Sequence, residues 1–222
     1  MTSATLMASD YPNIRRTLFG LHEKILKLVS RSDMTAVGQQ LGLLRGKVLV
    51  FQNEVESQML FDYLVYAHRP NGINMAELYL RINRQRLDAL QIDLLERMSQ
   101  CLFLYVKTLS VDPGSSLHVV DMIQNSPFTL VDQSLSTTSE PESGYAAHFL
   151  NLGSFFIQTG AIVGVDWRLI EAKELSPAWA LWERNRRYDS KLSTKMARAT
   201  LTAAIRLGHT AYVRAVPIDD NE

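Results

Sequence analysis

One stretch of the chain decides its fold class: Cys101-Leu-Phe-Leu-Tyr-Val-Lys-Thr-Leu-Ser-Val111, followed by the turn Asp112-Pro113-Gly114. It is rich in aromatic and branched residues, which favour extended backbone. Before Cys101 the apolar residues recur every three to four positions, as they do on one face of a helix. The pattern therefore predicts that the backbone changes from helix to strand near Cys101.

Further short segments with strand character follow at close intervals, separated by Gly, Pro, Asn and Ser. They are Leu117–Val120, Phe128–Val131, Tyr145–Leu150, Ser154–Gln158 and Ala161–Val165. This spacing predicts a small antiparallel β-barrel or a strongly bent sheet. The stretch from Ser134 to Gly144, which has five Ser or Thr residues before Glu140-Pro141, is predicted as a polar loop at a strand crossing.

Helices are predicted on the N-terminal side of this β module. The first opens at Tyr11-Pro12, because proline is tolerated in a first helical turn. Others are expected after the cap Ser32-Asp33, over Glu54–Ala67, and from Met75 towards Gln100 with a break near Asn83. The segment Lys47–Phe51 is predicted as a short strand between them.

Two helices are predicted after the β module, one from Ser176-Pro177 and one capped by Ser190 that ends at Gly208. The fold class is therefore α+β: a helical region at 1–100, an antiparallel β module at 101–166, and C-terminal helices at 167–214 that pack on the rest. Residues 215–222 are predicted as a frayed acidic tail.

Composition restricts the class of protein. The 222 residues carry 23 Lys plus Arg against 23 Asp plus Glu, so the net charge indicates no particular partner. A single cysteine cannot form an internal disulfide, which favours a reducing compartment. The first ten residues lack the features of a signal peptide, and no apolar run reaches the ~20 residues of a membrane helix. We expect a cytoplasmic protein that does not enter a membrane.

Scattered positions in the middle of the chain resemble a known group of proteins. The stretches are Phe61-Asp-Tyr-Leu-Val-Tyr66, Arg69-Pro-Asn-Gly72, Glu77-Leu-Tyr-Leu80, Val111-Asp-Pro-Gly114 and Val120-Asp-Met122. Over about residues 50–165 the chain resembles uncharacterised bacterial proteins that often carry a SecA-type C-terminal (SEC-C) zinc motif. One cysteine cannot build that motif, so no zinc-dependent role follows from the resemblance, and those proteins imply no activity.

Motifs that would indicate catalysis or a cofactor are not found in the sequence. There is no Gly-x-Ser-x-Gly elbow, no phosphate-binding glycine loop, and no pair of histidines at metal-ligand spacing. We therefore predict no cofactor and no metal, and the balance is against an enzyme. If the β module folds back on the Glu54 helix, Asp62, Asp112 and Asp121 would form an acidic cluster. The candidate pocket residues are Asp62, His68, Arg69 and Asp112. Helix capping and turn formation are the ordinary roles of such residues.

The distribution of charge is the most informative feature for function. From Arg168 to Arg214 there are ten Lys or Arg and four acidic residues, a local net charge of +6. Aromatic residues Trp179, Trp182 and Tyr188 are interleaved. A basic face beside aromatics is suited to phosphates and unstacked bases, although most charged helix faces are only solvated. The candidate nucleic-acid-binding residues are Arg184, Arg186, Arg187, Lys191, Lys195 and Arg198.

The sequence alone does not decide the function, and three hypotheses remain open. The leading one is a non-catalytic interaction protein, with a protein partner or a second copy bound through amphipathic helices or the edges of the β module. The second is nucleic-acid binding through the basic C-terminal helices. The third is an enzyme with its site between the helical half and the β module, where pockets commonly form.

Overall fold

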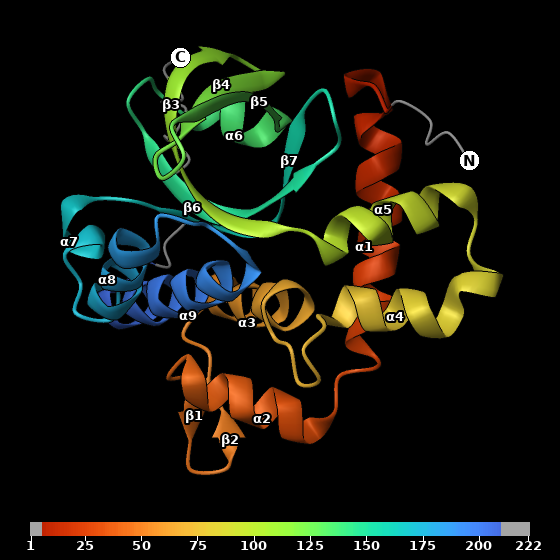
Figure 1. Cartoon of the computed structure of the whole chain (residues 1–222), viewed down its shortest axis with the longest axis vertical. Helices are drawn as coiled ribbons and strands as arrows, with labels where there is room; N and C mark the ends of the chain where they lie inside the picture. Colours follow the sequence, from red (N-terminus) through yellow and green to blue (C-terminus); the bar gives the residue numbers. More distant parts are fainter. Residues whose placement is uncertain (1–5, 210–222) are drawn as a thin grey trace, which may run out of the picture.

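The structure, a computed structural model, describes residues 6–209. Figure 1 shows a β-barrel at one end of the molecule and helices packed below and beside it. The α+β prediction is confirmed, with a barrel in the middle of the chain and helices on both sides of it. The tail 215–222 lies outside the described residues. None of the described helices is long and apolar enough to cross a membrane.

The N-terminal helices surround α3, which lies below the barrel in Figure 1. In chain order the elements are a 3-10 turn Ala8–Asp10, α1 Tyr11–Leu26, α2 Arg31–Gln40, β1 Leu44–Arg45, β2 Val48–Leu49, α3 Glu54–Tyr66, α4 Met75–Asn83, a 3-10 turn Arg84–Arg86 and α5 Ala89–Ser99. Asparagine side chains accept hydrogen bonds at the starts of α3 and α4, from Glu56 N and Glu77 N. The predicted break near Asn83 is confirmed by the turn between α4 and α5.

The β module is a closed barrel. Its strands are β3 Leu102–Asp112, β4 Ser116–Asp121, β5 Ser126–Val131, β6 Gly144–Asn151 and β7 Phe156–Gly164, and around the barrel they follow the order β3-β4-β5-β7-β6. All pairings are antiparallel except β5 with β7, where Leu130 pairs with Phe156. A short helix, α6 Gln133–Thr138, lies between the third and fourth strands. This strand order with its inserted helix is the topology of the OB-fold.

In the first half of β3, residues 103–106, both faces are buried, which explains the nearly continuous apolar sequence there. Leu104 and Val106 face the barrel interior, where they join one core cluster. Phe103 and Tyr105 face the opposite way and join the cluster that contains α3 and the C-terminal helices. The period-two alternation of side chains along a strand thus connects two cores through one segment.

The C-terminal helices cover the outside of β3. They are α7 Trp167–Ile170, α8 Ser176–Asn185 and α9 Ser190–Leu207. One face of α9 is buried, with Leu192, Met196, Ala199 and Ala203 facing inward and Leu207 half-buried at its end. Asp189, rather than Ser190, caps α9 by accepting a hydrogen bond from Leu192 N. Gly208 ends α9 in the left-handed conformation, as predicted.

Several local predictions were wrong. Lys47–Phe51 contributes only β2, which forms a hairpin with β1. The predicted polar loop at 134–144 begins with α6, whose N-cap Asp132 accepts a hydrogen bond from Leu135 N. The two strands predicted at 154–158 and 161–165 are one strand, β7, which continues through Gly160. The interaction hypothesis expected a partner to bind at the edges of the β module. Because the barrel closes, it offers no free edge to a partner strand.

Candidate functional site

Asp62 takes part in a buried polar network between α3 and the barrel. Its carboxylate contacts His148 Nδ1 of β6 at 2.5 Å and accepts a hydrogen bond of 2.7 Å from Thr159 Oγ1 of β7. The side chains of His148 and Asp62 are 1% and 4% exposed. Strands β6 and β7 are neighbours, so the helix needs only one residue to reach both.

Aromatic rings extend this network towards α1. Tyr66, one turn after Asp62 in α3, stacks on the His148 ring with centroids 5.3 Å apart. Its hydroxyl is 2.6 Å from His22 Nε2. Burial lowers the pKa of His22 and raises the pKa of Tyr66 well above its usual value. The partly buried imidazole of His22 therefore favours its neutral form.

A cavity of about 220 Å³ adjoins the network, with Asp62, Thr159 and His22 among its lining residues. It lies at the boundary where the enzyme hypothesis expected a site. It is, however, smaller than the ~300 Å³ at which ligand pockets begin. Both carboxylate oxygens of Asp62 already have partners within the protein. Asp62 thus forms a polar link between α3 and two strands of the barrel.

The other residues of the predicted pocket lie elsewhere. His68 follows α3, and its Nε2 is 2.9 Å from Asp33 Oδ1 in α2. The hydrogen bonds from Ser30 and His68 lower the pKa of Asp33. Arg69 is half-buried beside it. Asp112 is exposed at the end of β3, in the turn to β4, and does not line the cavity that Asp62 lines.

The surroundings of Cys101 do not favour a thiolate. Cys101 is buried and its thiol donates to Phe149 O at 3.2 Å. Burial raises the pKa of this thiol well above its usual value, so it stays protonated. Among residues 6–209, no three His, Cys, Asp or Glu side chains are grouped so that they could hold a metal ion.

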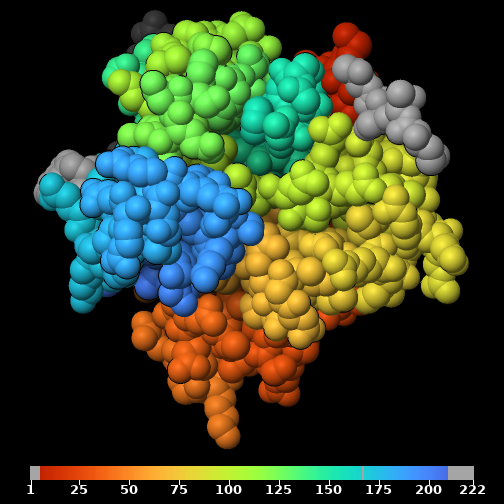
Figure 2. Space-filling model, viewed as in Figure 1, coloured from red at the N-terminus to blue at the C-terminus, as the bar shows by residue number. Residues whose placement is uncertain are grey.

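The predicted basic residues lie on the hairpin formed by α8 and α9. We call the surface made by Arg184, Arg186, Arg187, Lys191, Lys195 and Arg198 the cationic surface. All six side chains are exposed, and none forms an ion pair with a carboxylate among residues 6–209. By contrast, Arg168 is paired with Asp166, and Arg206 makes two hydrogen bonds to Glu174. Figure 2 shows the α8–α9 region, in blue, directly beside the barrel.

The interleaved aromatic residues have different roles. Arg186 lies over the ring of Trp182, 4.6 Å from its centroid, which is a cation–π contact. Trp179 instead packs on Tyr105, with centroids 5.3 Å apart, and belongs to the core. Tyr188 donates a hydrogen bond to the carbonyl of Phe103 in β3. Only Trp182 among the three is therefore associated with the cationic surface itself.

A depression in the cationic surface includes two of its residues. Lys195 and Arg198 line a cavity of about 290 Å³ that also touches Gln40 of α2 and Pro177 of α8. Its one acidic lining residue, Glu174, is paired with Arg206. Lys195 and Arg198 are three positions apart on α9, so they share one face of the helix. Two exposed cations beside a hollow are suited to an anionic group such as phosphate.

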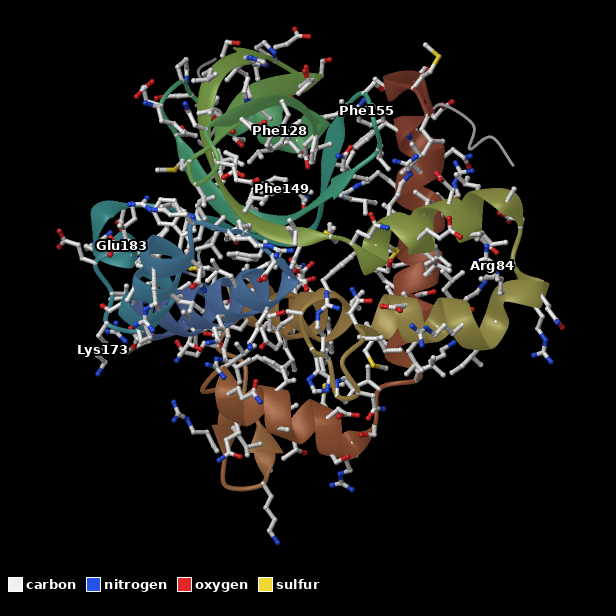
Figure 3. The ribbon with its side chains drawn as sticks, in the orientation of Figure 1. Arg84, Phe128, Phe149, Phe155, Lys173 and Glu183 are labelled. Atoms are coloured by element: carbon white, nitrogen blue, oxygen red, sulfur yellow. The ribbon has the colours of Figure 1, made fainter. Side chains whose placement is uncertain are left out.

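Sequence reasoning missed a second cavity, at the end of the barrel opposite α6. We call this cavity of about 440 Å³ the barrel mouth. Phe128 of β5, Phe149 of β6 and Phe156 of β7 line it, and Figure 3 shows Phe128 and Phe149 inside the ring of strands. The rings of Phe128 and Phe156 have centroids 4.2 Å apart. These residues lie on different strands, so only barrel closure brings them together. In the sequence, the only indication of this cavity was that each of them lies at an inward-facing position of its strand.

Comparison with known proteins assigns the chain to a family but indicates no activity. A family model described as a family of unknown function, DUF7986, matches residues 7–163. The match includes the helical half, the barrel and the barrel mouth, while the cationic surface lies beyond it. No curated protein and no solved structure matches the chain. The resemblance to proteins with a SEC-C motif is not tested by this match and stays a prediction.

Proposed function

We propose that this chain, which belongs to the DUF7986 family of unknown function, is a non-catalytic protein that binds nucleic acid through the cationic surface. The observation that carries the proposal is the exposure of six cations on one helical hairpin without a described carboxylate partner. Surface cations in folded proteins commonly have nearby acids. Here the single acid between residues 184 and 198, Asp189, is engaged in capping α9.

The barrel topology supports the proposal only in part. OB-folds bind oligonucleotides on the face of their second and third strands, although a fold alone does not determine a function. In this chain those strands are β4 and β5, and their sequences, SLHVVD and SPFTLV, contain no Lys or Arg. The one phenylalanine in them, Phe128, lines the barrel mouth instead of the outer face. Phosphate contacts are therefore assigned to α8 and α9.

The test is binding of labelled single- and double-stranded oligonucleotides, followed by fluorescence anisotropy from about 50 mM salt upward. Each phosphate contact on a single strand lowers the slope of log affinity against log salt by about 0.7, so five contacts give a slope of about −3.5. The variant Arg186→Gln/Arg187→Gln/Lys191→Gln is expected to make that slope shallower by about 2.

A matched control removes positive charge elsewhere. Lys24 and Lys27 are exposed on and just after α1, and Lys24→Gln/Lys27→Gln changes the net charge without touching the cationic surface. The control variant is expected to bind like the unmodified protein. If the unmodified protein binds neither probe at about 50 mM salt, or if both variants lose affinity equally, the proposal is wrong.

Self-association is a second candidate, supported by a separate observation. Phe19 of α1 is 67% exposed and Phe61 of α3 is 37% exposed. Both line the 220 Å³ cavity between these helices, so they form one apolar patch instead of scattered single residues. Light scattering tests this candidate: a dimer that Phe19→Ser converts to monomer supports it, and a monomer at all concentrations contradicts it.

A further inference from the structure

We propose that the barrel mouth binds the single unstacked base of a nucleotide or of a single strand. The neighbouring cationic surface holds the phosphates of the same ligand. This inference rests on the proposed function and specifies it, because it requires a single strand or a free nucleotide as the ligand. The barrel mouth lies within the residues matched by the family, whereas the cationic surface does not.

The size and lining of the cavity are suited to a planar ring. Its volume of about 440 Å³ is within the range of ligand pockets. Phe128 and Phe156 are half-buried and tilted by 34° to each other, and Phe149 lies edge-on to Phe128, with centroids 6.1 Å apart. Aromatic faces stack with any base, since every base has a π-face.

The rim offers hydrogen-bonding groups whose polarity is set by the protein. Gln124 donates its amide nitrogen to Asp121 Oδ2 at 3.0 Å, which leaves the Gln124 carbonyl oxygen as an acceptor. Asn151 accepts from Gly153 N at 2.8 Å with its carbonyl oxygen, which leaves the Asn151 amide as a donor. The edge of a nucleobase carries both donors and acceptors, whereas an aliphatic chain carries neither. The rim thus favours a heteroaromatic ligand over a purely apolar one.

The charge of the rim is compatible with a neutral base. Asp121 is 2% exposed, and its two oxygens accept hydrogen bonds from Ile123 N, Gln124 N and the Gln124 side chain. Arg97 is engaged with Asp93 Oδ2 and with the carbonyl of Asn151. With both charged groups engaged in this way, the mouth itself is not built to take a phosphate. The phosphates must be held outside it.

The cationic surface begins next to the wall of the barrel mouth. Tyr188, which directly follows Arg187, donates its hydroxyl to the carbonyl of Phe103 in β3. The neighbours of Phe103 on that strand, Leu102 and Leu104, line the mouth. Tyr188 also packs against the core cluster that includes Phe149. Arg186 and Arg187 directly precede Tyr188 in the chain, so the cationic surface is joined to the wall of the mouth through this residue.

The experiment compares how tightly the full chain binds two oligonucleotides of the same length. One has ordinary bases, and the other has abasic sites throughout. Phosphate contacts are the same for both, so a difference in affinity reports the base. We expect the base-bearing strand to bind about tenfold more tightly, which is within the range measured for base–aromatic stacking. Gln124→Ala and Phe128→Leu should reduce this ratio, while Arg186→Gln/Arg187→Gln should weaken both strands alike.

The outcomes separate the two proposals. Equal, salt-sensitive binding of the two strands overturns the nucleobase site and leaves the cationic surface as a phosphate-binding surface. Because Phe128→Leu is in the barrel and could impair folding, the exposed rim variant Gln124→Ala serves as the independent reading.

A second arm titrates the four nucleoside monophosphates and follows the side-chain amide signals of Gln124 and Asn151 by NMR. Shifts at these amides that require the base, and are not produced by ribose 5-phosphate, support the site and identify a free nucleotide as a ligand. If neither the oligonucleotides nor the monophosphates shift these amides, the barrel mouth does not bind a base.

Discussion

Removing the carboxylate of Asp62 should be among the most destabilising single changes in the helical half. The substitution Asp62→Ala removes the partner of His148 Nδ1 at 2.5 Å and of Thr159 Oγ1 at 2.7 Å. Both donors are buried. His148 Nδ1 loses its partner at a cost of about 1–3 kcal/mol, whereas Thr159 Oγ1 keeps the carbonyl of His148 as an acceptor at 3.2 Å and loses about 0.5–1.5 kcal/mol. The sum is about 1.5–4.5 kcal/mol.

The consequence is measurable as a loss of thermal and chemical stability. For a chain of this size each kcal/mol shifts Tm by about 2–4 °C, so Asp62→Ala should lower Tm by about 3–18 °C. Urea unfolding followed by tryptophan fluorescence gives the same free energy independently. Thr159→Val removes one of the two hydrogen bonds and keeps the volume, so we expect it to cost about 1 kcal/mol.

The two substitutions should be non-additive because they share one carboxylate. In a double-mutant cycle, Thr159→Val should cost less when Asp62 is already alanine. A change of less than 1 kcal/mol for Asp62→Ala, or strict additivity in the cycle, would refute the view that this network ties α3 to the barrel.

Other expected outcomes depend on single features. Cys101 should react with iodoacetamide at pH 8 far more slowly in the native protein than in urea, because burial raises its pKa and shields it; equal rates would contradict its placement. Burial lowers the pKa of His22 below the unfolded value of 6.5, so the stability associated with its neutral form is present above pH 6.5 and is lost as the pH falls towards the folded pKa. Urea midpoints from pH 7.5 to 5 should therefore decline less steeply for His22→Gln, and parallel curves would exclude this contribution. Gly208→Ala should destabilise by about 1 kcal/mol, since residue 208 has φ +71°, whereas Gly20→Ala in the middle of α1 has free space and should stabilise by up to about 1 kcal/mol. Calorimetry on both glycine variants checks the opposite signs.

Elements with a strong local pattern were predictable from the sequence. The change from helix to strand at Cys101 was visible because the first half of β3 is buried on both faces and so has an almost unbroken apolar sequence. The amphipathic helix α9 was visible from the spacing of its apolar residues and its terminal glycine. In both cases the burial that stabilises the element also determines its composition.

Elements that depend on their surroundings were missed. Helix α6 is six residues long and mostly Ser and Thr, which have modest helix propensity, so only its cap at Asp132 indicated a helix. Strand β7 was divided at Gly160, since glycine weakens the interior of a strand. In the structure a Cβ at Gly160 would lie 3.2 Å from Asp62 Oδ1, so the position leaves little room for a side chain beside the buried network.

The candidate sites differ in the same way. The cationic surface consists of residues close in sequence, so counting charges located it. The contact between Asp62 and His148 joins residues 86 positions apart. The barrel mouth joins residues of three strands. Neither leaves a local pattern in the chain.

The attachment of α9 to β3 has a consequence for synthesis on the ribosome. Phe103 N donates to Ser193 Oγ at 2.7 Å, and Tyr105 shares a hydrogen bond with Thr200, across 90 and 95 residues. The chain can complete its barrel once residue 164 has emerged, yet the outer aromatic side chains of β3 stay uncovered until α9 follows. Nascent chains stalled after residue 164 and before α9 has emerged should therefore expose Phe103 and Tyr105 and bind chaperones. A protein truncated after residue 166 should aggregate, although it contains every barrel strand.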